Sequence, residues 1–355
     1  MARYFRVSKS SILTFFRCGV QWFFEYLTNL PRRTDYPRLG GGEIHQHIQL
    51  IHRTPKQPRP FYFRTLKAAL GSWSHRWDRA LEREKDRIIL PNAEAAEKMR
   101  LHGYKCIANY WKANYQKIAP LAIEKRFKYL LPDMQNILLY GIFDQLRTPS
   151  LEFIKKNRPE IFINGQLSPE YDPVLIVDLK SEYVGKGFYK DDSLEEKIRG
   201  QFKMNVSLEP VIYTYLYNQT MGKRPVGFVY YYLSNNNYIF VRCDDQDYQM
   251  MLYIIKIFIE GVRSESFTKA AGSHCRYCDY LEACSERSNL YYSEPTDFSL
   301  VSDEQIIQSF SSPVIQPQAR QLKFKFKVPR SPKKLPKLRP KSSKIILPDP
   351  LPWRN

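Results

Sequence analysis

The chain has 355 residues, of which 43% are hydrophobic and 14% aromatic, and its formal net charge is +19. This composition is typical of a globular protein, and no apolar stretch approaches the roughly 20 residues that cross a bilayer. Arg17 interrupts the best apolar run near the amino terminus, so we expect no secretory signal and a cytoplasmic protein whose six cysteines need not form disulfides.

The first predicted elements are helices. Apolar residues at helical spacing predict a helix over residues 9–27, with Ser8 or Ser10 as its N-cap. Glycines 40–42 predict a turn before a second short helix, EIHQHIQLIH. A longer charged pattern with helical spacing follows over residues 58–118, and we interpret it as a helical insertion.

After Pro120 the pattern changes to that of strands. Three short runs are rich in β-branched and aromatic residues: LAIEKRFKYLL, NILLYGIFDQL and PVLIVDLKS. A helical region extends to about residue 220, and VGFVYYYLSNNNYIFVRC then predicts a hairpin. Residues 245–263 return to a helical pattern. Helices and strands together predict an α/β fold.

The carboxy-terminal end, residues 311–355, is predicted to be a disordered basic arm. Eleven Lys and Arg residues occur from Arg320 to Lys344 without an acid, and the remainder of the chain keeps a charge of about +8. A solvated tail without a partner is one interpretation. A basic body with a basic arm favours nucleic acid, although charge does not distinguish DNA from RNA or an acidic membrane surface.

A small constellation of polar residues marks the strand ends. Asp178 and Lys180 end an apolar strand on one face, where a carboxylate can hold a divalent cation and a lysine can orient or deprotonate a water. Asp144 ends the preceding strand, and His45 follows the predicted glycine turn. Glu124 is a weaker candidate that we expect to face outward. Taken singly, the Asp-x-Lys triplet is more often an exposed strand-end pair, and a lone histidine such as His45 is more often a packed or surface residue.

Three cysteines lie close together in HCRYCDYLEAC: Cys275, Cys278 and Cys284. Thiolate sites usually have four soft ligands, so this set lacks one. Zinc and an iron–sulfur cluster are both compatible with such ligands.

The order of His45, then Asp144 in GIFD, then Asp178-Leu179-Lys180 resembles the PD-(D/E)XK nuclease superfamily. The similarity is greatest to its RecB-type branch, which includes AddB-like and CRISPR-associated nucleases, and VSKSSILTFFRCGVQWFFEYL resembles the first helix of that branch. The resemblance covers roughly residues 8–48 and 119–286. It implies a restriction-endonuclease-like α/β fold, in which helices flank a central mixed sheet, within a nuclease domain over residues 1–310.

The resemblance also implies roles for individual residues. Four ligands would hold one or two Mg²⁺ or Mn²⁺ ions: His45, Asp144, Asp178 and the main-chain carbonyl of Leu179. Lys180 would orient the attacking water. The family usually has Gln-x-x-x-Tyr in the following helix, but here that register has Glu209 and Tyr213 with Pro210 between them. Tyr213 and the earlier Gln201 are therefore the candidates for contact with DNA.

Iron–sulfur members of the branch take one cluster ligand from the first helix and three from a carboxy-terminal C-x2-C-x5-C, here within residues 271–286. The resemblance thus implies a structural four-iron four-sulfur cluster, with zinc as the less favoured occupant. Its ligands would be Cys18, Cys275, Cys278 and Cys284.

The function that these observations predict is metal-dependent DNA hydrolysis, as an exonuclease acting on single-stranded ends in repair, recombination or related processing. A helicase or a recombination or CRISPR protein is the expected partner, and no membrane is involved. The rival interpretation is a non-catalytic DNA-binding or scaffold protein on the same fold, against which the intact Asp-x-Lys argues. A zinc-stabilised RNA-binding protein would leave the order of His45, Asp144 and Asp178 unexplained.

Overall fold

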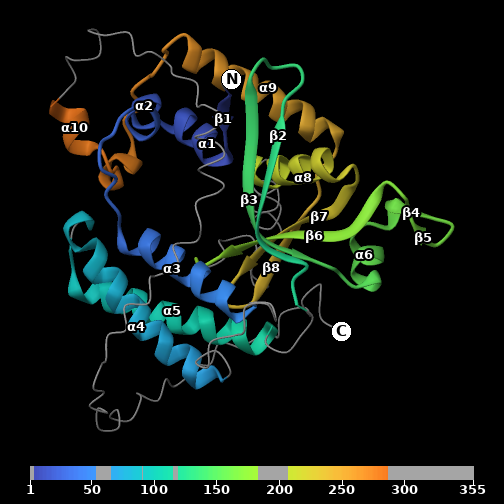
Figure 1. Cartoon of the computed structure of the whole chain (residues 1–355), viewed down its shortest axis with the longest axis horizontal. Coiled ribbons are helices and arrows are strands. Elements are labelled where there is room, and N and C mark those ends of the chain that lie inside the picture. The colour runs from blue at the N-terminus through green and yellow to red at the C-terminus, as the bar shows by residue number, and fades with distance from the viewer. Residues whose placement is uncertain (1–3, 53–64, 90, 115–118, 183–206, 287–355) are drawn as a thin grey trace, which may run out of the picture.

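A six-stranded mixed sheet forms the centre of the computed structural model, which describes residues 4–52, 65–89, 91–114, 119–182 and 207–286. The strand order is β1-β3-β6-β7-β8, and β2 pairs with β3 (Figure 1). The strands are β1 (Phe5–Val7), β2 (Ala122–Leu130), β3 (Ile137–Arg147), β6 (Tyr171–Lys180), β7 (Arg224–Tyr232) and β8 (Asn237–Val241). The predicted basic arm, residues 311–355, and Gln201 lie outside the described residues.

Helices cover both faces of this sheet. One core contains side chains of α1 (Lys9–Arg17), α2 (Gly19–Leu27), α8 (Leu208–Met221) and α9 (Asp245–Arg263). The other contains side chains of α3 (Tyr36–Ile51), α4 (Leu66–Glu84) and α5 (Ala93–Asn114). Successive side chains of β6 point into the two cores in turn: Ile176 packs in the first core, and Leu175 and Val177 pack in the second. The predicted α/β fold with a central mixed sheet flanked by helices is confirmed, consistent with a restriction-endonuclease-like fold.

Smaller elements lie outside these layers. Residues 150–172 contain α6 (Leu151–Asn157), the 3₁₀ helix η3 (Pro159–Ile161) and a two-stranded sheet of β4 (Phe162–Ile163) and β5 (Gln166–Leu167). A 3₁₀ helix η2 (Lys85–Arg87) follows α4. Near the end of the described chain, η4 (Ser273–Tyr277) and α10 (Leu281–Glu286) lie beside α2 in Figure 1.

The three predicted strands after Pro120 and the hairpin of β7 and β8 are confirmed. The helix predicted at residues 245–263 is α9, and Asp244 forms its capping box with Asp247. Strand β1 was not predicted, because three residues are too few for a period to be recognised.

Two helix predictions need correction. The helix expected over residues 9–27 is two helices, because Cys18 is extended and the N–H of Gly19 donates to the carbonyl of Thr268 instead of continuing the first helix. Ser8 is the N-cap of α1, as one of the two predicted candidates. Glycines 40–42 do not form a turn: they lie inside α3, which begins after the N-cap Asp35.

Close packing explains a helical glycine at position 40. A Cβ atom on Gly40 would lie 2.4 Å from the side chain of Met99 in α5. The glycine therefore allows α3 and α5 to approach, and the local sequence alone does not reveal this contact.

Helix α3 is fixed to α4 by polar contacts. Glu43 is buried and accepts a hydrogen bond of 2.8 Å from Arg83, and it also forms an ion pair with Arg76. One turn later, His47 lies 3.1 Å from the carbonyl oxygen of Ala69. Since Glu43 and His47 are four residues apart, they lie on one side of α3.

No helix in the described part of the chain is both long enough and apolar enough to cross a membrane.

The contact between α4 and α5 gives a test of this helical layer. A Cβ atom on Gly103 would lie 2.1 Å from the ring of Trp73, which is fully buried, so Gly103→Ala should lower the free energy of unfolding by about 1–3 kcal/mol. Gly71→Ala in α4 is the matched control, because nothing lies within 4 Å of its added Cβ atom. That variant should stabilise the protein by about 0.5–1 kcal/mol. Chemical denaturation measures both, and equal effects would contradict the packing.

Candidate functional site

The site is built where strands β3 and β6 separate. Their ladder joins Gln145 to Val177, Leu146 to Ile176 and Arg147 to Leu175. At the next positions the carboxylate of Asp144 takes the place of a main-chain acceptor, since the N–H of Leu179 donates to its Oδ2 at 2.8 Å. The two strands therefore form a fork where their ladder stops, at the end of β6 and inside β3, and an acidic side chain is held in it.

His45 reaches this fork from α3. It lies between Glu43 and His47 in the sequence, and because those two residues contact α4, the imidazole of His45 is directed to another side of the helix. Its Nδ1 is 3.4 Å from Asp144 Oδ2. Burial lowers the pKa of His45, but the charge of Asp144 and the hydrogen bond to it raise the pKa by more than burial lowers it. The net shift is upward.

The same contacts keep Asp144 ionised. Burial raises the pKa of this carboxyl, but His45, the Leu179 N–H and Lys180 outweigh burial, so the pKa lies below its ordinary value. Asp144 and His45 are thus held as an ion pair. The N–H of Leu179 supports that pair, while the role of its carbonyl oxygen as a metal ligand stays a prediction.

Asp178 and Lys180 project together from the end of β6, as predicted. The ammonium of Lys180 lies 2.6 Å from Asp178 Oδ2 and donates a hydrogen bond of 3.0 Å to Glu209 Oε2 in α8. Lys9 in α1 forms an ion pair with the other oxygen of Glu209. Two lysines and two carboxylates from three elements therefore form one buried network.

The network sets the charge of Lys180 and Glu209. Burial lowers the pKa of Lys180, but Asp178 and Glu209 raise it well above its ordinary value, so the amine stays protonated at neutral pH. Burial raises the pKa of Glu209, yet Lys180 and Lys9 lower it below the ordinary value. Glu209 is therefore an anionic anchor for two cationic side chains.

Asp178 is less well satisfied than its neighbours. Its Oδ2 is a buried oxygen without a hydrogen-bond donor, because Lys180 is close enough for an ion pair but poorly aligned for a hydrogen bond. Burial, followed by the charge of Glu209, raises the pKa of Asp178 to about 7. Such an oxygen is suited to receive a cation.

The residues at the fork have the donor chemistry of a Mg²⁺ or Mn²⁺ site. Asp144 and Asp178 provide carboxylate oxygens and His45 an imidazole nitrogen, and the unbonded Oδ2 of Asp178 fits a cation. In the present arrangement Asp144 is paired with His45, and Asp178 is paired with Lys180. No three His, Cys, Asp or Glu residues of the described chain form a group that could hold a metal ion. Binding would therefore require these ion pairs to rearrange.

Glu124 lies at the fork and does not face outward as expected. It is opposite Asp144 in the register of β2 and β3, and its φ of +49° interrupts the ladder there. Its Oε1 accepts a hydrogen bond of 2.7 Å from Gln49 of α3. Burial and the charge of Asp144 raise the pKa of Glu124 to about 7. A third carboxyl group thus borders the pair of Asp144 and His45.

Tyr213 packs behind the site. Its ring stacks on Phe143 with centroids 4.8 Å apart, and a Cβ atom on Gly141 would lie 3.0 Å from it. Burial, and then Asp178 and Glu209, raise the pKa of Tyr213. Contact of Tyr213 with DNA remains a prediction, as does that of Gln201 beyond the described residues.

Sequence reasoning did not identify the network formed by Lys9 and Glu209. The available signal was the acid at position 209, where the resembled family usually has Gln. Nothing in the sequence around Lys9 indicates that it pairs with a residue 200 positions away.

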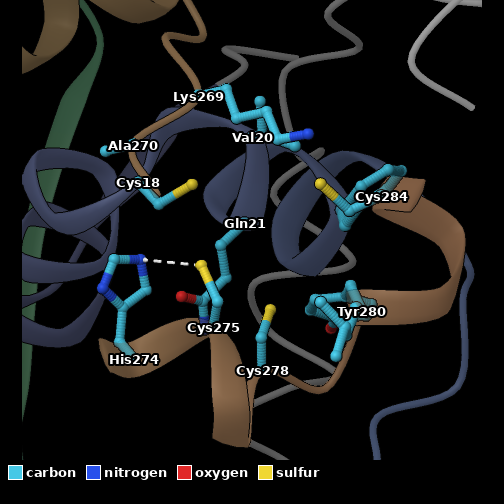
Figure 2. A pocket seen from close by; sticks show the side chains of 12 residues that line it. Cys18, Val20, Gln21, Lys269, Ala270, His274, Cys275, Cys278, Tyr280 and Cys284 are labelled. Carbon is cyan, nitrogen blue, oxygen red and sulfur yellow. Dashed lines mark hydrogen bonds between the residues drawn. The ribbon is translucent and has the colours of Figure 1, made fainter. Parts of the chain in front are cut away.

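The four predicted thiolate ligands line one pocket. Cys18 lies between α1 and α2, Cys275 and Cys278 at η4, and Cys284 in α10, and Figure 2 shows their sulfur atoms around a common space. All are free cysteines. The extended backbone of Cys18, which breaks the predicted first helix, places this residue in the wall of the pocket.

The sulfur atoms are close enough to affect one another. Burial raises the pKa of Cys278, and the charges of Asp279, Cys18 and Cys275 raise it further against one main-chain hydrogen bond. The N–H of Gly272 donates to the sulfur of Cys275 at 3.4 Å. His274 lies 3.9 Å from the same sulfur, as the dashed line in Figure 2 marks. Thiolates are the donors that zinc and iron–sulfur clusters bind, but as the side chains stand these cysteines form no group, among the described residues, that could hold a metal ion.

A salt bridge ties the cysteine segment to α3. Asp279, next to Cys278, is buried and accepts two hydrogen bonds from Arg38, of 2.8 and 2.6 Å. Arg32 also lies 3.7 Å from this carboxylate. The helix that carries His45 is therefore anchored at its first turn beside the cysteine pocket.

Comparison with known proteins relates the first part of the chain to a nuclease family. The model of the PD-(D/E)XK nuclease superfamily matches residues 6–154, which include His45 and Asp144, whereas Asp178 and Lys180 lie beyond the match. None of the curated proteins matches the chain. Residues 6–154 thus have the sequence pattern of a PD-(D/E)XK nuclease superfamily domain.

Proposed function

We propose that the protein is a metal-dependent nuclease that hydrolyses phosphodiester bonds at the fork of β3 and β6. The observation that carries this proposal is the meeting of His45, Asp144 and the Asp178–Lys180 pair from α3, β3 and β6. The family match over residues 6–154 supports the same activity.

The chain's own residues provide a metal site and a cationic donor. His45, Asp144 and Asp178 would hold Mg²⁺ or Mn²⁺, with the Leu179 carbonyl as a further ligand. When bound, the ion would supply Lewis-acid stabilisation of the charge that develops on the scissile phosphate. Lys180 is held protonated by two carboxylates, so it would donate a hydrogen bond to the attacking water and orient it.

Glu209 positions this lysine. It holds Lys180 from α8 at 3.0 Å and is itself neutralised by Lys9, so the ammonium does not depend on Asp178 alone. Asp178 can therefore turn toward a cation while Lys180 keeps an anionic partner. This arrangement favours catalysis over a non-catalytic scaffold, in which burial of Asp178 Oδ2 without a hydrogen bond would only lower stability.

We propose a four-iron four-sulfur cluster as the occupant of the cysteine pocket. Its support is the convergence of four free cysteines from three separate elements, in the ligand pattern of the RecB-type branch. Bound there, the cluster would join α1 and α2 to η4 and α10. Zinc is the alternative, because it accepts the same four thiolates.

The finer activity that we propose is exonucleolytic cleavage of DNA at single-stranded ends, in repair or recombination in the cytoplasm, with a helicase as the partner class. The net charge of +19 supports a polyanionic substrate.

Replacement of Lys180 tests the chemistry. Lys180→Ala should lower Mn²⁺-dependent cleavage of end-labelled single-stranded DNA by roughly 10²–10⁴-fold, because the group that orients water is lost. Lys180→Arg, which keeps the charge, separates this effect from folding. Lys223→Ala is the matched control and should keep the parent's activity. Lys223 directly precedes β7, at the opposite end of the β6–β7 ladder from Lys180, and its ammonium lies 3.8 Å from Asp172. Full activity in Lys180→Ala at the parent's melting temperature would exclude the proposed site.

Metal binding should depend on pH through Asp178. With a folded pKa of about 7, raised from 3.8, this carboxyl group makes the metal-free protein less stable as pH rises from about 4 to about 7, because over that range the folded state holds a proton that the unfolded state has already released. The cation binds the ionised form. The rise in melting temperature on addition of Mn²⁺ should therefore be larger at about pH 8 than at about pH 5.5.

The controls for this measurement lie on the same strand. Asp178→Asn should remove most of the Mn²⁺ effect at the higher pH, whereas Asp172→Asn at the start of β6 should keep it, because Asp172 instead accepts a hydrogen bond from Tyr217. An equal Mn²⁺ effect in parent and Asp178→Asn protein would mean that this carboxylate is no ligand.

Colour tests the cysteine pocket. Protein purified without oxygen should be brown with broad visible absorbance, as iron–sulfur proteins are, and Cys18→Ser should lose the colour. Cys243→Ser should retain it, because Cys243 does not line the pocket. Colourless protein with one zinc per chain would refute the cluster but not the nuclease proposal.

A further inference from the structure

The hairpin of β2 and β3 has an exposed basic face beside the fork. Arg126 and Lys128 in β2 are exposed, and so is Ile142 in β3, with 38% of its surface accessible. Tyr140 is half-buried, and the guanidinium of Arg6 in β1 lies 4.2 Å from the centre of its ring. One surface thus carries basic side chains from β2 beside an aromatic and an apolar side chain from β3.

The pairing register places these side chains together. Arg126 is opposite Ile142, and Lys128 is opposite Tyr140, and directly opposed residues of an antiparallel pair share a face. The intervening residues point to the other face, where Phe127 stacks on Phe143 with centroids 4.3 Å apart. Phe127 and Phe143 therefore belong to the core, whereas Arg126, Lys128 and Ile142 lie exposed on the opposite face.

This face continues into the fork. Ile142 lies two residues before Asp144 on β3, and Arg126 lies close enough to Glu124 for its charge to lower the pKa of that carboxyl group. Along a strand, residues two apart are about 7 Å apart. The basic row therefore begins next to the acidic site and extends away from it.

We propose that one strand of the nucleic-acid substrate runs along this face to the fork, with its phosphates against Arg126 and Lys128 and its bases beside Tyr140 and Ile142. The proposal rests on the nuclease function. It assigns the substrate path to the outer face of the β2–β3 hairpin, independently of the basic arm.

A single strand fits this surface better than a duplex does. Base faces are accessible only when the strand is unpaired, and aromatic and apolar side chains bind them without regard to sequence. Basic side chains about 7 Å apart can follow an extended sugar–phosphate backbone. In a duplex the bases would be stacked away from Tyr140 and Ile142, so these side chains would contribute nothing.

The test compares two substitutions on the same strand with full-length protein. Binding of a fluorescent single-stranded DNA oligonucleotide is measured in EDTA over a range of salt concentrations, with a hairpin duplex as the second probe. Arg126→Ala with Lys128→Ala should weaken single-strand binding and reduce the steepness of the log–log salt dependence by about 1.4, because two phosphate contacts are lost at about 0.7 each. Lys125→Ala is the matched control: it removes an exposed charge from β2, but Lys125 is opposite Phe143, on the other face.

Cleavage distinguishes this inference from the nuclease function. The double variant should keep Mn²⁺-dependent cleavage at saturating substrate and show a raised KM. If the parent cleaves DNA but the double variant binds like Lys125→Ala, the path is wrong while the nuclease function stands. Ile142→Ala, which removes an apolar group beside the bases, should weaken single-strand binding more than duplex binding, and equal losses in this variant would overturn the single-strand path. A parent that neither binds nor cleaves either probe would refute the nuclease function itself.

Discussion

The hydrogen bond from the N–H of Leu179 to the carboxylate of Asp144 holds the site together. Where two strands of a sheet separate, main-chain donors lose their partners, and a buried donor without an acceptor costs free energy. Here the side-chain carboxylate of Asp144 supplies the acceptor at 2.8 Å; this residue lies inside β3, three residues before its end, and not at the strand end as the sequence predicted. The acid is thereby fixed between the strands, and His45 can approach it from α3 while Asp178 projects beside it from β6.

Around this point, charge is kept in balance by pairing. Lys9 and Lys180 share Glu209, Lys180 also approaches Asp178, and His45 stays with Asp144. Buried charges of this kind persist only when they are compensated. A cation that binds Asp178 at the fork would replace Lys180 as the partner of this carboxylate. With a pKa of about 7, the carboxyl group of Asp178 can either bind a cation or keep its proton near neutral pH.

Much of the sheet and of the site was predictable, because both depend on local pattern. The apolar run before Asp178 specifies a buried strand, and the spacing of Asp178 and Lys180 specifies a shared face, as the 2.6 Å ion pair confirms.

The remainder depends on contacts between distant segments. The glycine at position 40 of α3 follows from its contact with Met99, and the break at Cys18 follows from the hydrogen bond between Gly19 and Thr268. The inward position of Glu124 follows from a left-handed backbone that a non-glycine residue seldom adopts. No local period encodes any of these.

Helix α3 has a consequence beyond the fork. Arg38, in its first turn, donates hydrogen bonds to Asp279. The same helix carries His45 about two turns, or roughly 10 Å, further along. Helix α3 thus connects the segment that carries Cys278 with the imidazole of His45. A displacement of the cysteine segment would therefore be transmitted through α3 to the side chain that pairs with Asp144.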